Sequence, residues 1–285
     1  MELTRLLIGL PNVIIFSGPV HARLLYVFWT RPDFYKRQCY RIMTQMEILT
    51  CLLLPYYFFM GCSILLQHQL FGITINLANV AACITLCLNT MDLVLALNRV
   101  KVIFSLNYPS AFDHALQACV WLLGLGSVAI QFSPYAGFTF TDDILGAEPD
   151  MSLAWVDAYS IIINFTLAST VVIVVCYVAI VAKLVYEKLQ TGYVGRNSYE
   201  KQILLNAVIR FLGDFLAQMC FKVTFLVEGW GGSPRLVQIF SQLADFLSMF
   251  NYTCVAPVLY MVLNRNIRAA VVNKKTTVNV IPASL

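Results

Sequence analysis

The feature that most constrains this 285-residue chain is the apolar stretch at 72–98, which ends in Asn98 and is followed by Arg99. Residues 73–90 carry no charge, and a helix over the whole stretch, rising about 1.5 Å per residue, crosses the ~30 Å hydrocarbon core of a bilayer. Asp92 lies seven residues before Arg99, so the two side chains share a helix face about 10 Å apart. The stretch therefore predicts a membrane span that ends in a charged pair.

An ionisable side chain at membrane depth is expensive and normally faces protein or a water-filled cavity. Asp92 therefore predicts that other helices surround its span. Arg99 has two readings: it reaches the interface simply to stop translocation, or it has a functional role at the membrane edge.

The composition agrees with a membrane protein. Hydrophobic residues make up 59% of the chain, charged residues 12%, and the mean hydropathy is +0.74, whereas soluble domains carry about 25% charged residues. The net charge of +4 is small. We expect an integral protein of the lipid bilayer and no nucleic-acid partner.

The chain divides into seven apolar segments and a tail. Fourteen lysines and arginines lie in the linkers and tail of one side, against two on the other, so the positive-inside rule places the amino terminus outside and the carboxyl terminus in the cytoplasm. We expect one all-α domain over 1–285, a seven-transmembrane helix bundle, with a tail at 264–285 that begins as a short surface helix. The expected spans are 6–29, 42–66, 72–98, 116–136, 158–182, 203–227 and 236–263.

Several charged residues fall inside these spans. The sixth span is the most polar, and a soluble amphipathic helix is the alternative reading of it, although its flanks favour a span. Arg210 and Asp214 are spaced to pair within that helix, and Lys222 could pair with Asp245 of the seventh. Glu47 is either an interfacial acid or a partner for Arg99. The expected buried polar network comprises Asp92, Arg210, Asp214, Lys222 and Asp245.

Enzyme chemistry is not indicated. The three histidines, His21, His68 and His114, are far apart, and no phosphate loop or dinucleotide fingerprint is present. Cys83 and Cys87 share a helix face but have no further ligands nearby, so packing is the favoured reading over a metal site. No lysine in 236–263 can form a retinal Schiff base. We expect no enzyme activity, no cofactor and no metal.

Two short motifs close the third and seventh spans. Leu97-Asn98-Arg99 stands where rhodopsin-like G-protein-coupled receptors have an acid, an arginine and an aromatic residue, and Pro257-Val258-Leu259-Tyr260 is similar to the proline and tyrosine of their seventh span. With the segments 39–43 and 259–268, the chain resembles the nematode serpentine chemoreceptors, most nearly class T.

The chain also departs from the receptor pattern. Asn98 replaces the acid, Val100 replaces the aromatic residue, and Thr50 stands where an aspartate is expected. The sixth span has no tryptophan or proline. Neither the outer end of the third span nor the acidic loop at 137–157 has a cysteine, so the disulfide that often ties this loop to the bundle cannot form.

The resemblance implies a G-protein-coupled chemosensory receptor of the cell membrane that binds an extracellular small molecule, and the membrane of a sensory cilium is a location compatible with it. It implies a heterotrimeric G protein as partner and helix rearrangement at the cytoplasmic face, with Asn98, Arg99, Pro257 and Tyr260 as coupling residues. The alternative is a transporter or channel that uses Asp92, Asp214 and Asp245 as an ion path. The lack of an internal repeat and of paired broken helices counts against transport.

Overall fold

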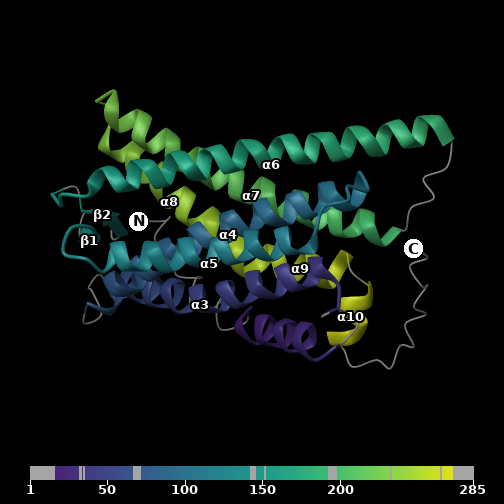
Figure 1. Ribbon diagram of the computed structural model, residues 1–285. Coiled ribbons are helices and arrows are strands. Elements are labelled where there is room, and N and C mark those ends of the chain that lie inside the picture. Colours follow the sequence, from purple (N-terminus) through teal and green to yellow (C-terminus); the bar gives the residue numbers. More distant parts are fainter. Residues whose placement is uncertain are drawn as a thin grey trace.

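The computed structural model describes residues 17–31, 34, 36–66, 72–141, 146–150, 152–191, 198–231, 233–263 and 265–271. The long helices run side by side, with a small hairpin at one end of the bundle and α10 at the other (Figure 1). In chain order the elements are a helix over 17–30, α3 (Gln38–Leu66), α4 (Ile73–Ile103), α5 (Ser110–Gln131), β1 (Phe138–Thr141), β2 (Gly146–Pro149), α6 (Val156–Thr191), α7 (Ser198–Gly229), α8 (Pro234–Phe250), the π-helical turn η1 (Asn251–Val255), α9 (Ala256–Leu263) and α10 (Arg265–Val271).

Four of the described helices, α3 to α6, contain stretches long and apolar enough to cross a bilayer. All four differ in extent from the expected spans, and α5 and α6 differ most. α5 begins six residues before 116 and ends five before 136, because Pro109 precedes its first turn and Pro134 follows its last. α6 continues nine residues past 182, where Lys183 and Glu187 form an ion pair one turn apart (3.4 Å).

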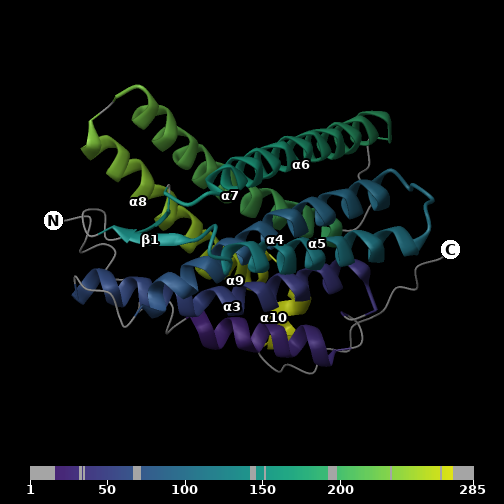
Figure 2. The ribbon, with the colours of Figure 1, turned by 60° about the vertical axis from the view of Figure 1, so that its left-hand side comes forward.

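The remaining expected spans also correspond to helices. The span at 203–227 lies within α7, and the span at 236–263 lies within the uninterrupted run of α8, η1 and α9. α7 and α8 pack against each other along their lengths (Figure 2). Of the span at 6–29, only residues from 17 onward fall in the described part of the chain, and these are helical. The short helix expected at the start of the tail is present as α10.

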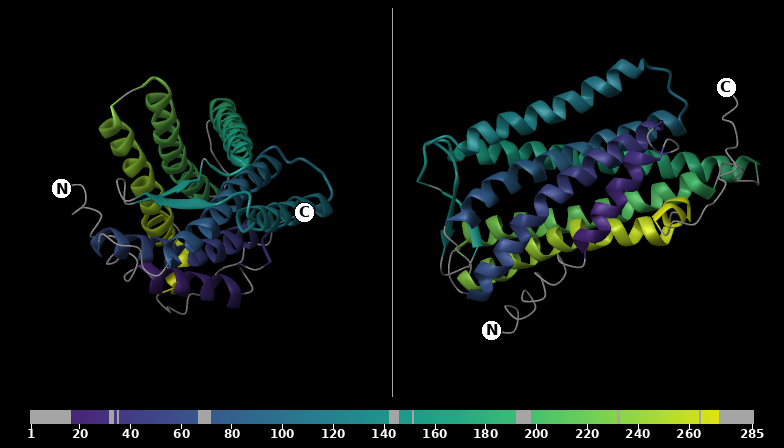
Figure 3. Two further views of the ribbon diagram at one scale, coloured as in Figure 1. Left: turned by 90° about the vertical axis from the view of Figure 1, so that its left-hand side faces the viewer. Right: turned by 90° about the horizontal axis from the view of Figure 1, so that it is seen from below.

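The bundle is built around α4. It packs against α3, α5 and α6 (Figure 3). Its side chains are buried on most of its faces from Thr74 to Ile103. Asp92 is among these buried side chains. The expectation that an acid at this depth requires neighbouring helices is therefore confirmed.

A second apolar cluster joins the first helix, α3, α9 and α10. The ring of Phe28 meets the rings of Tyr40 and Tyr260 at centroid distances of 5.9 and 5.7 Å, and Ile267 of α10 is fully buried in the same cluster. The guanidinium of Arg23 donates to the carbonyl oxygen of Val271 at 3.3 Å. These contacts fix α10 against the end of the bundle.

The acidic loop contains a β-hairpin that the sequence analysis did not expect. β1 and β2 pair antiparallel, with Phe138 opposite Pro149, and the hairpin lies across one end of the bundle (Figure 3, left). The backbone N–H of Phe138 donates to Asn79 Oδ1 of α4 at 3.1 Å. The rings of Tyr135 and Trp155 stack at the base of the hairpin, 5.1 Å apart. Noncovalent contacts thus attach the loop to α4.

Candidate functional site: a polar junction at the π-helical turn

The π-helical turn η1 is where the polar interactions of the bundle converge. Its widened backbone is marked by the N–H of Ala256, which bonds to the carbonyl of Asn251, five residues earlier. Pro257 follows directly. Proline has no N–H and its ring crowds the carbonyl four residues before it, so an α-helix cannot continue regularly through this position. The carbonyl of Thr253, at that position, consequently lacks its usual helical donor.

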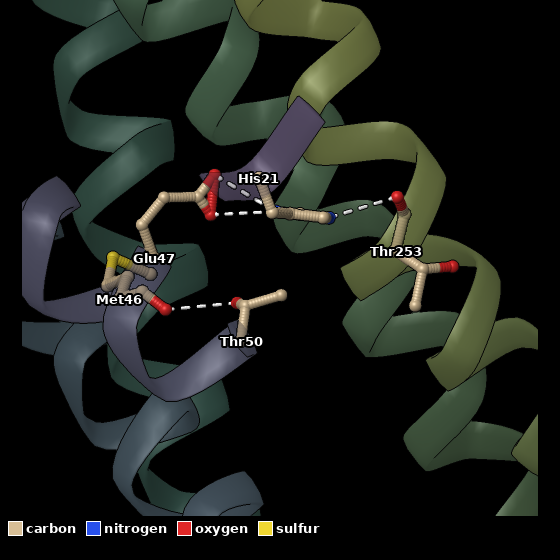
Figure 4. A network of polar contacts seen from close by, with 5 residues as sticks. All are labelled: His21, Met46, Glu47, Thr50 and Thr253. Carbon is tan, nitrogen blue, oxygen red and sulfur yellow. Dashed lines mark hydrogen bonds and ion pairs between the residues drawn. The ribbon is translucent and has the colours of Figure 1, made fainter. Parts of the chain in front are cut away.

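A histidine from the first helix supplies the missing donor. His21 Nε2 lies 3.1 Å from the carbonyl oxygen of Thr253, and His21 Nδ1 lies 3.1 and 3.2 Å from the two carboxyl oxygens of Glu47 in α3 (Figure 4). His21 and Glu47 are 0% and 1% exposed. The pair therefore joins three helical segments that are distant in the chain.

The hydrogen bonds of His21 and Glu47 determine how many protons the two side chains hold together. A carbonyl oxygen only accepts, so Nε2 must carry a proton. The second proton lies between Nδ1 and Glu47, either on an imidazolium beside a carboxylate or on a carboxylic acid beside a neutral ring. In both forms the pair is neutral overall, which suits its burial.

Both sequence-based interpretations of Glu47 are wrong. Glu47 is neither an interfacial acid nor the partner of Arg99, because it is fully buried and binds His21. Spacing in the sequence gives no sign of the partners of His21, because they lie 26 and 232 residues away in the chain. The signal that could have revealed one of them is Pro257, which leaves the Thr253 carbonyl in need of a donor.

Asn251 connects η1 to α7. Its amide nitrogen donates to Asp214 Oδ1 at 2.8 Å and to the carbonyl oxygen of Arg210 at 3.0 Å. The close approach requires Gly213, because a β-carbon at that position would lie 2.4 Å from Asn251 Oδ1. Asn251 begins a glycosylation-type triplet, yet its side chain is 1% exposed and engaged in the bundle.

Arg210 extends the junction to α4. Its Nε lies 3.8 Å from Asp92 Oδ1, and its guanidinium lies 5.7 Å from the ring centroid of Tyr252. The hydroxyl of Tyr252 reaches Asn89 Oδ1 of α4 at 3.5 Å. The spacing of Arg210 and Asp214 predicts a pair within one helix, whereas the ion pair of Arg210 with Asp92 crosses from α7 to α4.

The structure thus brings together Asp92, Arg210 and Asp214 of the expected polar network. Lys222 and Asp245 lie elsewhere. Lys222 is eight residues beyond Asp214 on α7, and Asp245 is six residues before Asn251, so helical rise separates them from the junction by about 12 and 9 Å. Lys222 is half-buried and Asp245 is exposed.

The expected coupling residues lie toward the α10 end of the bundle. Asn98 and Arg99 are buried, and the Arg99 guanidinium donates to the thiol of Cys39 at the start of α3. Pro257 and Tyr260 are buried as well, with Tyr260 packed edge-on against Phe28. The arginine is therefore held by a cysteine of α3, a contact that the sequence analysis did not identify.

An ion pair joins α4 to α5 two residues after this arginine in the chain. Lys101 forms a 2.7 Å ion pair with Asp113 and lies 3.9 Å from the ring centroid of Tyr108. Burial, together with the neighbouring Asp113, raises the pKa of Tyr108 to about 12. The phenol is therefore neutral at physiological pH.

Among the described residues, no group of three or more His, Cys, Asp or Glu side chains is arranged to hold a metal ion. Cys83 and Cys87 make packing contacts instead. The thiol of Cys83 bonds to the Asn79 carbonyl at 3.2 Å, and that of Cys87 lies 3.8 Å from the Val120 carbonyl.

Comparison with known proteins identifies the fold. No family profile and no curated protein matches the sequence. Among solved structures, squid rhodopsin is similar over 96% of this chain and 84% of its own, with a TM-score of 0.76 and 14% sequence identity. The chain therefore has a rhodopsin-like fold, the fold of G-protein-coupled receptors, and its apolar helices are those of a membrane protein.

Proposed function

We propose that this protein is a G-protein-coupled chemosensory receptor of the cell membrane, with seven spans, an outer amino terminus and a cytoplasmic carboxyl terminus. The observation that carries the proposal is the likeness to rhodopsin over 96% of the chain. The lysine and arginine distribution supports the orientation. The motifs at 97–99 and 257–260 support membership of the nematode serpentine chemoreceptors, most nearly class T, and location in a sensory cilium would follow from that membership.

The ligand in this proposal is a small molecule from outside, bound between the outer halves of α4, α6, α7 and α8. The hairpin supports this location, because Asn79 holds it to α4 across the end of the bundle. The proposal includes no enzymatic activity and no cofactor. In particular, the run from α8 to α9 contains no lysine that could carry retinal.

Coupling to a heterotrimeric G protein takes place at the opposite end. Arg99 is buried and bound by Cys39, and Tyr260 is packed against Phe28, so the arrangement described here keeps both side chains inside the bundle. Ligand binding favours a second arrangement in which these contacts open and Arg99 becomes available to the G protein, with Asn98 beside it and with Pro257 and Tyr260 moving together.

The test is ligand-evoked signalling in cells that carry a promiscuous G-protein reporter, screened with volatile and water-soluble small molecules. We expect a response that Arg99→Ala abolishes at equal surface expression. Arg235→Ala is the matched control, since it removes an exposed arginine at the start of α8. A surface-expressed Arg99→Ala variant that signals normally would contradict the coupling role.

A transporter or channel is the second candidate, favoured by one observation: Asp92 and Asp214 lie buried together in the bundle core. Acids at that depth are typical of ion pathways. Ligand-evoked current or uptake that Asp214→Asn removes, without G-protein activation, would favour transport. G-protein activation without current would favour the receptor.

A further inference from the structure

Two carboxyl groups face each other between α4 and α7. Asp92 and Asp214 are 8% and 6% exposed and lie within hydrogen-bonding range of one another. Asp214 Oδ1 is occupied by the Asn251 amide, and Asp92 Oδ1 faces Arg210. The other oxygen of each acid, Oδ2, is buried and has no hydrogen-bond donor among the described residues.

The charge of the site is unbalanced if both acids are ionised. Arg210 supplies one positive charge against two negative ones. Among the described residues, the other titratable side chains in electrostatic range are four neutral phenols, Tyr177, Tyr57, Tyr252 and Tyr260. His21 also lies in range of Arg210, and it is already paired with Glu47. Two carboxylates at contact distance cannot both remain charged at low cost, and an unbalanced charge in the protein interior is strongly unfavourable.

We propose that Asp92 and Asp214 together bind one proton, which forms an O–H···O hydrogen bond between α4 and α7. The proton comes from solvent water. It supplies the one donor that the two carboxyl groups lack, and it brings the net charge of the two acids and Arg210 to zero. The geometry that carries the proposal is the opposed pair of buried acids with a single arginine.

A proton suits this site better than a metal ion. The Arg210 guanidinium lies 3.8 Å from Asp92 Oδ1 and would repel a second cation there. Calcium and magnesium also require six or more oxygen ligands. Among the described residues, the buried side-chain oxygens of this site without a hydrogen-bond partner are Asp92 Oδ2, Asp214 Oδ2 and Asn251 Oδ1.

The proton has a consequence for signalling that rests on the proposed receptor function. Its loss places two like charges against each other between α4 and α7, which favours separation of the two helices. If α7 moves away from α4 in the active arrangement, ligand-independent signalling should rise as the pH is raised. The rise should be smaller in Asp214→Asn, because the asparagine amide does not titrate.

The test is infrared spectroscopy of the full-length protein in lipid nanodiscs, because a protonated carboxylic acid has a C=O stretching band that a carboxylate lacks. At neutral pH we expect this band in the wild type, with a shift in D₂O and a loss at higher pH. The component that belongs to this pair should be absent in Asp92→Asn and in Asp214→Asn, where the remaining acid is balanced by Arg210, whereas any component from Glu47 remains in both. Asp245→Asn is the matched control and retains the band.

Two further measurements complete the test. Glu47→Gln retains the band if it belongs to the Asp92 and Asp214 pair, so loss of the band in this variant alone would assign the proton to Glu47 and overturn the proposal. Replacing choline by sodium at constant pH leaves the band in place, and its disappearance would show that a metal ion occupies the site. The readout does not use signalling, so a failure of the receptor proposal would leave it intact.

Discussion

His21 Nε2 donates to the carbonyl oxygen of Thr253 at 3.1 Å, at the one helical position where Pro257 has no N–H to offer. The hydrogen bond that Pro257 removes from the last long helix is thereby replaced by one from a side chain of the helix over 17–30. Because Glu47 of α3 holds the other ring nitrogen, this hydrogen bond also fixes the orientation of the first helix relative to α3.

The His21 and Glu47 pair should respond asymmetrically to substitution. His21→Leu leaves a buried carboxyl group without its partner, and we expect a loss of about 3–5 kcal/mol in unfolding free energy. Glu47→Gln should cost only ~1 kcal/mol, because the glutamine amide donates to Nδ1 while Nε2–H still binds Thr253. Thermal unfolding in nanodiscs measures both.

A double variant tests the same pair independently. His21→Leu combined with Glu47→Leu removes both polar groups, so most of the stability lost in His21→Leu should return. Equal losses in the two single variants, or no recovery in the double variant, would contradict the paired arrangement.

Gly213 should be intolerant of a single methyl group. The β-carbon of Gly213→Ala would lie 2.4 Å from Asn251 Oδ1, so the Asn251 side chain must leave Asp214 or the helices must separate, at a cost of about 1–3 kcal/mol. Gly126→Ala in α5 meets no atom within 4 Å and should be neutral or slightly stabilising. A lower unfolding temperature for Gly126→Ala than for Gly213→Ala would refute this packing argument.

Cys39 should restrain Arg99 in the resting arrangement. Cys39→Ala removes the acceptor of the guanidinium, and a loss of about 1 kcal/mol raises ligand-independent signalling roughly fivefold. Cys39→Ser keeps an acceptor and should remain near the wild type, and Cys51→Ala serves as the cysteine control. Basal reporter activity at matched surface expression is the measurement, and unchanged activity in Cys39→Ala would argue against a restraining role.

Asn79 should anchor the hairpin. Asn79→Ala deprives the Phe138 N–H of its acceptor, and losing one hydrogen bond worth about 1 kcal/mol should speed amide exchange of that N–H about fivefold. Asn76→Ala, three residues earlier and exposed, is the control. Hydrogen–deuterium exchange by mass spectrometry reports both, and equal protection in the two variants would show that the hairpin is held by other contacts.

The apolar runs of the sequence were enough to predict the helices. Residues 72–98 carry no charge before Asp92, and such a run has few alternatives to a membrane helix, so α4 appears close to where it was expected. The hairpin was missed because only four residues pair on each strand. The alternation of apolar and polar residues there is too short to distinguish a strand from a loop.

The pairing of the polar side chains depends on how the helices are rotated, and the sequence does not contain that information directly. Spacing alone suggested Arg210 with Asp214, because i and i+4 residues share a helix face. In the structure, Arg210 forms an ion pair with Asp92, and Asp214 accepts a hydrogen bond from Asn251. Likewise the link of Arg99 to Cys39 spans 60 residues and arises only when α3 and α4 are packed.

The π-helical turn also affects how this chain aligns with its relatives. A turn of this kind accommodates one residue more than an α-helical turn, so residues after Val255 are rotated by about 100° from the positions that a regular helix would give them. A homologue with an unbroken α-helix here would align correctly only with a one-residue gap inside the membrane span. In evolutionary terms, a single-codon deletion at this turn would move Tyr260 away from Phe28 while leaving every motif letter in place.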